Sequence, residues 1–115
     1  MEDQKIAEVS SRVTSFLSGH VRAVWELELL FFFKRSERPL QVQEISRALY
    51  MEAGVLQPTI ARWVEEGILQ SSEDRKQSFI YRPRAQSVAD AIEETRQVYV
   101  QRRVTLISLI YSTLP

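Results

Sequence analysis

The chain has 115 residues and carries 15 basic and 15 acidic side chains, so its formal net charge is zero. It has no cysteine and one histidine, His20, which excludes disulfides, thiolate metal sites and sites built from several histidines. Of its residues, 44% are hydrophobic and 26% charged, with no targeting signal and no apolar run near the roughly 20 residues that span a bilayer, so one cytoplasmic domain without membrane association is expected.

The first predicted element is a helix over residues 3–17. Apolar residues recur there at spacings of three and four and form one narrow stripe along the helix: Ile6, Val9, Val13, Phe16 and Leu17. Ser18 and Gly19 are expected to end the helix, since glycine tolerates the left-handed conformation that closes many helices. The stripe could pack on the chain's own core or on a second subunit.

Residues 20–35 form the most hydrophobic predicted helix. Because almost all of its surface is apolar, it is expected to be the central helix and to be buried on several sides. Glu26 and Glu28 are the exceptions and are expected at its edge. His20 could act as a pH switch, but its place near a helix start favours a surface or capping role. Pro39 keeps the following connection out of the helix, and a short strand could lie there.

Two shorter helices are predicted next, one over residues 41–50 and one from Gln57 onward, with a turn at Gly54 and with Pro58 near the start of the second. The apolar face of the first helix holds Val42, Ile45, Ala48 and Leu49. In the second helix the inward residues are Ile60, Trp63 and Val64, and the outward residues are Gln57, Thr59, Arg62 and Glu66. Trp63 could stack on a ligand or a base, but its helical spacing favours a place in the core.

After Gly67 the pattern changes to two short strand-like runs around a polar, charged tip, which predicts a hairpin. Four cations of this segment outnumber its two acids; they are Arg75, Lys76, Arg82 and Arg84, against Glu73 and Asp74. Cations on a hairpin suit contacts to phosphates, although a solvated turn that keeps its cations for solubility explains them nearly as well. Helix, turn, helix and hairpin is the order of a winged helix-turn-helix.

The longest helix candidate covers residues 87–114 and begins at Ser87, a suitable N-cap. Its apolar stripe comprises Val88, Ile92, Thr95, Tyr99, Leu106, Ile107 and Ile110. A chain of this size has little core left to cover both terminal helices. We therefore predict a homodimer through these helices. We favour the second subunit over the chain's own core as the partner of the stripe in residues 3–17, because a terminal helix before a winged domain is often a dimer arm.

The fold class expected from these elements is mainly α with a small β-hairpin. It is a single winged-helix domain with three parts: an N-terminal helix arm (1–19), a winged-helix core (20–85) and a C-terminal dimerisation helix (86–115).

About a third of the chain resembles a known group of proteins. The matching residues are Glu44-Ile45-Ser46, Leu49, Ile60-Ala61-Arg62, Val64 and Glu66-Gly67-Ile68-Leu69, and the charged tip Asp74-Arg75-Lys76. They are similar to those of bacterial winged-helix transcriptional regulators, the multiple-antibiotic-resistance and phenolic-acid-response repressors. The resemblance implies binding to double-stranded DNA and dimerisation through terminal helices.

The function expected from this reading is that of a dimeric DNA-binding regulator. Gln and Arg can read adenine and guanine edges with two hydrogen bonds. The residues expected to contact bases are Gln57, Thr59 and Arg62, and those expected to contact phosphates are Arg75, Lys76 and Arg82.

Other functions fit parts of the sequence. Zero net charge and the acidic pair Glu65–Glu66 favour a winged-helix module that binds a protein and no DNA. An enzyme is not expected, because adjacent acids on a helix point in different directions and no other catalytic, metal or cofactor-binding pattern is present. A small apolar effector could bind in a cavity lined by aromatic residues, although core packing explains them as well: Trp25, Phe31, Phe32, Tyr99 and Tyr111.

Overall fold

The structure is a computed structural model that describes residues 9–72 and 77–113. Helices predominate in these residues, and three short strands form one antiparallel sheet. The chain divides into two compact units. One is formed by residues 28–85 and the other by the segments that precede and follow it. The boundary between them falls within a helix, α3 (Val24–Ser36).

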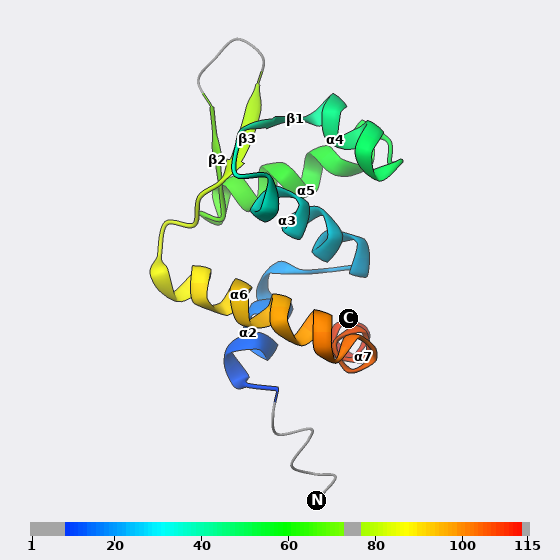
Figure 1. The fold of residues 1–115 in the computed structure, drawn as a ribbon, viewed down its shortest axis with the longest axis vertical. Coiled ribbons are helices and arrows are strands. Elements are labelled where there is room, and N and C mark those ends of the chain that lie inside the picture. The colour runs from blue at the N-terminus through cyan, green and yellow to red at the C-terminus, as the bar shows by residue number, and fades with distance from the viewer. Residues whose placement is uncertain (1–8, 73–76, 114–115) are drawn as a thin grey trace, which may run out of the picture. The chain divides into compact units, whose positions relative to one another are not determined.

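The unit of residues 28–85 has the winged helix-turn-helix arrangement (Figure 1). After α3 its elements are β1 (Leu40–Gln41), α4 (Val42–Leu49), α5 (Ala53–Glu65), β2 (Leu69–Ser71) and β3 (Ser78–Tyr81). The sheet order is β1-β3-β2, with Leu40 opposite Phe79 and Leu69 opposite Tyr81. The expected fold class is confirmed, and the short strand considered after Pro39 exists and pairs with the hairpin.

The first helix of this unit begins later than expected, at Val24 rather than His20. The Glu26 carboxylate accepts a hydrogen bond of 2.9 Å from the backbone N–H of Arg22, which satisfies a donor just before the helix. Glu26 is 3% exposed, so the expectation that it lies at the edge of the helix is wrong, and this contact gives its buried carboxylate a partner. His20 instead closes the preceding helix.

The turn between α4 and α5 lies earlier than expected. Tyr50 adopts a left-handed conformation with φ 57°, and the backbone N–H of Met51 donates to the Ser46 carbonyl at 3.1 Å. Gly54 therefore belongs to α5 and not to the turn, and Pro58 is the sixth residue of the helix rather than near its start.

The buried face of the helix pair confirms part of the predicted core. Trp63 and Ile45 are fully buried and Ile60 nearly so. Ala48, expected on the inward face of the first helix, is exposed. The other predicted inward residues of the two helices are half-buried.

The second unit contains α2 (Ser11–His20), α6 (Gln86–Gln101) and α7 (Arg103–Thr113), with α2 in contact with both other helices. Ser10 caps α2 by accepting a hydrogen bond from the Val13 backbone N–H at 3.3 Å. The helix continues through Ser18 and Gly19, so the predicted stop there is wrong.

The apolar stripe of α2 is covered within the chain itself. Val13, Phe16 and Leu17 are between 0% and 4% exposed, so these residues are not available to a second subunit. Our preference for a partner chain as the cover of this stripe is therefore wrong for these three positions. Ile6 lies outside the described residues.

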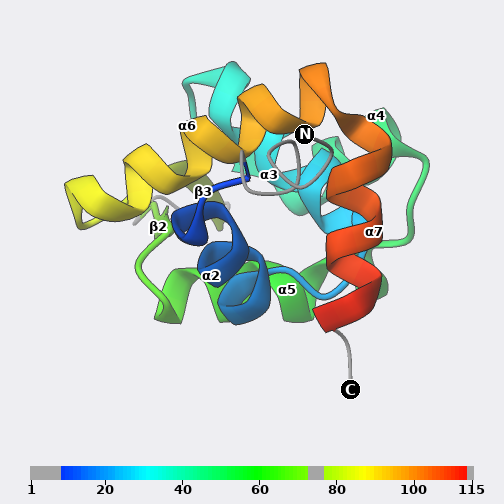
Figure 2. The same ribbon diagram turned by 90° about the horizontal axis from the view of Figure 1, so that it is seen from below.

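The predicted long terminal helix is two helices with a break at Arg102. Figure 2 shows α7 turning away from the axis of α6. The turn lets both helices contact α2, and it buries Ile92 and Thr95 on α6 and Leu106 and Ile110 on α7. If α6 and α7 were one straight helix, the buried residues of both could not reach the short helix α2. Tyr111 lies on the other side of α7 and is 64% exposed.

No helix in the described part of the chain has the length and apolar character needed to cross a membrane.

Candidate nucleic-acid interface

The exposed face of α5 differs from the one predicted. Thr59 is 3% exposed, so the prediction that it points outward is wrong. The buried residues of α5 are Leu56, Thr59, Ile60 and Trp63, which follow the helical spacing of three and four. Thr59 therefore belongs to the buried stripe. Gln57 is exposed, as expected.

Arg62 lies along its helix rather than pointing away from it. Its side chain is 18% exposed, and its Nε atom is 3.7 Å from Oε2 of Glu66, one turn later. The guanidinium also lies 6.0 Å from the centre of the Trp63 ring. Arg62 is the one cation of α5, so the exposed residues of this helix include no positive charge.

Arg82 is exposed, and its Nη1 donates to Oε1 of Gln70 at 3.3 Å across the base of the hairpin. Arg75 and Lys76, the other two predicted phosphate contacts, lie outside the described residues. Arg84 also carries an exposed side chain at the base of the hairpin. The sequence analysis counted Arg84 among the hairpin cations that suit phosphates but did not include it with the expected phosphate contacts, although its spacing of two from Arg82 was a usable signal.

Two surface depressions adjoin between α5 and the hairpin. The first, of about 350 Å³, is lined by Val42, Gln57, Ile60, Ala61, Val64, Ser71, Gln77 and Phe79. The second, of about 420 Å³, is lined by Val64, Leu69, Gln70, Ser71, Arg82, Pro83 and Arg84. Because they share Val64 and Ser71, they form one continuous surface, which we call the α5–wing surface.

Arg38 is also on this unit but is engaged elsewhere. Its guanidinium donates two hydrogen bonds to the Glu44 carboxylate, one of them at 3.3 Å. These hydrogen bonds from Arg38 hold the pKa of Glu44 below its usual value. The pair therefore connects the segment before β1 to α4 rather than offering a free cation.

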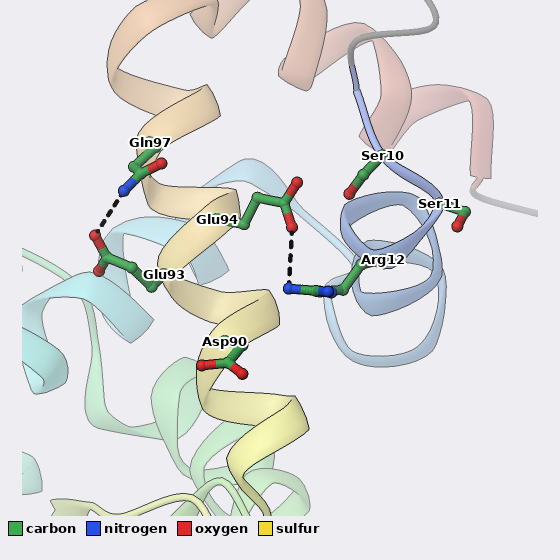
Figure 3. A pocket seen from close by; sticks show the side chains of 7 residues that line it. All are labelled: Ser10, Ser11, Arg12, Asp90, Glu93, Glu94 and Gln97. Carbon is green, nitrogen blue, oxygen red and sulfur yellow. Dashed lines mark hydrogen bonds and ion pairs between the residues drawn. The ribbon is translucent and has the colours of Figure 1, made fainter.

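The other unit has a depression of about 610 Å³ with three acids, lined by Ser10, Ser11, Arg12, Asp90, Glu93, Glu94 and Gln97 (Figure 3). Arg12 Nη1 lies 3.6 Å from Glu94 Oε1, and Gln97 Nε2 donates to Glu93 at 3.3 Å. Among the described residues no group of three or more His, Cys, Asp or Glu side chains could hold a metal ion. This depression is a surface of paired charges between α2 and α6.

The α5–wing surface thus joins one exposed amide on α5 to two exposed arginines on the hairpin, and it is the candidate site. Comparison of the chain with family models, curated proteins and solved structures finds no match.

Proposed function

We propose that the protein is a cytoplasmic, dimeric winged-helix regulator that binds double-stranded DNA through the α5–wing surface. The observation that carries the proposal is the continuity of this surface. It connects Gln57, which can hydrogen bond to a base edge, with Arg82 and Arg84, which suit phosphates. The resemblance to bacterial winged-helix repressors supports the same function.

Affinity and base reading are divided between different residues in this proposal. The arginines of the hairpin hold the duplex, and Gln57 reads a base. Arg62 contributes to base reading if it exchanges Glu66 for DNA. Arg62→Ala is then expected to relax the sequence preference, whereas loss of a phosphate contact weakens binding to all sequences alike.

The test is selection of bound sequences from a random duplex pool at about 0.15 M salt, where weak attraction to phosphates is partly screened. A recovered palindrome with half-sites one helical turn apart is the expected result for a dimeric regulator. Gln57→Ala should then relax the preference at one position of each half-site. A folded protein that enriches no sequence contradicts the proposal.

A second candidate function is binding to a protein, and one observation favours it. The exposed face of α5 has no cation, and the depression beside it is largely apolar, with Ala61, Val64 and Phe79 in its lining. If this function holds, no duplex binds, and a partner captured from a lysate is lost in Ala61→Arg, a substitution at an exposed position. Retention of that partner by Ala61→Arg would exclude the α5–wing surface as its docking site.

A further inference from the structure

We propose that Arg84 forms, together with Arg82, a phosphate-binding site at the base of the wing, and that Gly67 provides the space in which the Arg84 side chain lies. The inference rests on the proposed DNA binding and deepens it, because it assigns Arg84 to a defined site whose space Gly67 provides. Its ligand is a phosphodiester group of the duplex backbone.

The backbone fixes both arginines relative to the end of α5. The N–H of Arg82 donates to the Ile68 carbonyl at 3.1 Å, and the N–H of Arg84 donates to the Gly67 carbonyl at 2.8 Å. Pairing with the other side of the hairpin thus continues past the end of β3 at Tyr81. Both arginines line the same depression.

Gly67 explains the placement of the Arg84 side chain. Its φ of +81° is a conformation that favours glycine, and it ends the helical segment. A Cβ atom at this position would lie 3.1 Å from Cδ and 3.4 Å from Cγ of Arg84. The side chain of Arg84 therefore lies across Gly67, in space that any other residue would fill.

The charge around this site differs from that around two other arginines of the unit. Arg38 and Arg62 are each paired with a glutamate. Neither Arg82 nor Arg84 forms an ion pair with another described residue, and the described residues that line their depression include no acid.

The chemistry of the depression suits a phosphate. The planar guanidinium presents several N–H donors in a geometry that matches phosphate oxygens. Gln70 orients Arg82 through its carbonyl oxygen, which leaves its amide N–H groups free to donate to the same anion. The Ser71 hydroxyl lies in the same lining and in that of the depression beside α5. A phosphate held here would place the duplex against Gln57.

The test measures affinity for a labelled duplex as a function of salt concentration, for the full chain and for Arg82→Gln, Arg84→Gln and the double variant. Each single substitution should reduce the slope of log K against log salt by about 1, and the double by about 2. One phosphate contact adds about 0.9 to the slope of log K against log salt. Such a contact therefore strengthens binding about fivefold more at about 0.15 M salt than at about 1 M. The loss should be equal for selected and random duplexes.

Two controls separate this site from general charge effects. Arg35→Gln removes one exposed cation from α3, outside both depressions, and should leave the slope unchanged within error. Arg84→Lys keeps the charge and should retain the slope. Circular dichroism of each variant verifies that it is folded.

The outcomes distinguish the inference from the proposed function. If the full chain binds DNA but both Gln variants keep its affinity and slope, the phosphate site is overturned and DNA binding stands. If a variant loses affinity for the selected sequence alone, the arginine reads bases and the site is again overturned. If the full chain binds no duplex at any salt concentration, the proposed function fails, and the inference fails with it.

Discussion

Trp63 shows how far a single residue can be interpreted from its spacing. Its fully buried side chain confirms a place in the core and excludes base stacking in this conformation. Trp63→Ala should lower the free energy of unfolding by about 3–5 kcal/mol, because it removes apolar contacts and leaves a cavity. Denaturant unfolding measures this loss. Glu65→Ala, at an exposed neighbour, should change stability by less than about 0.5 kcal/mol, and an equal effect of both substitutions would contradict the core role.

Glu44 is the residue for which a pH dependence can be derived. Hydrogen bonds from Arg38 lower its pKa, so its ionised form is favoured in the folded state. The stability gained from this pair is present above the ordinary glutamate pKa, and it is lost as the pH falls through the lowered pKa. The gain is small, because the two side chains are 58% and 35% exposed and solvent screens them.

Arg38→Gln is therefore expected to raise the pKa of Glu44 toward its usual value. NMR titration of the Glu44 carboxyl group measures this change in pKa. Arg35→Gln removes an exposed arginine that is not paired with Glu44, and it should leave the titration unchanged. A Glu44 pKa that does not move in Arg38→Gln would show that the ion pair is absent in solution.

Among the elements, α5 departs from the sequence prediction in its start, which lies at Ala53 and leaves Pro58 inside the helix. The interior proline makes the continuity of α5 testable. Inside a helix a proline lacks the N–H that would bond to the carbonyl four residues earlier, here that of Gly54. A proline inside a helix lowers the free energy of unfolding by about 3 kcal/mol. Because proline also restricts the unfolded chain, it offsets up to about 1 kcal/mol of that loss.

Pro58→Ala is expected to stabilise the protein by about 1–2 kcal/mol, since the exposed ring packs on little that alanine would lose. The midpoint of thermal or denaturant unfolding measures the change. Destabilisation by this substitution would mean that α5 is not continuous between Ala53 and Glu65. Gln57→Ala, at the exposed position before it, serves as the control and should change stability little.

For the whole molecule, the homodimer expected from the sequence stays a prediction. The three buried residues of the α2 stripe are covered within the chain, so a dimer interface would not include them. Val100, Val104 and Tyr111 are 69%, 79% and 64% exposed near the end of α6 and along α7. Exposed apolar side chains of this size are the candidates for an interface.

We therefore expect the protein to sediment as a dimer at micromolar concentration and the Val100→Glu/Val104→Glu variant to sediment as a monomer with unchanged helix content. Two buried carboxylates would each lose hydration without a partner, which disfavours association. Ser15→Glu, an exposed substitution on α2, should remain dimeric. A wild-type monomer at that concentration would refute the dimer.

The order of the elements up to the hairpin, the burial of Trp63 and the position of the hairpin could be predicted from the sequence alone. These depend on local signals, namely apolar spacing of three and four, and the change of pattern after Gly67. The start of α5 was misplaced because glycine and proline normally mark turns, whereas the αL residue Tyr50 makes this turn. Once that start moved to Ala53, Pro58 became an interior residue of α5.

Which polar side chains are available for function depends on how the chain packs after folding. Thr59 belongs to the buried stripe of α5, Arg62 is drawn to Glu66, and Arg84 reaches the surface across Gly67. The break at Arg102 likewise follows from packing, since two helices at an angle can both cover α2. Side chains and helices find these partners only after the chain has folded, so no periodicity in the sequence could reveal them.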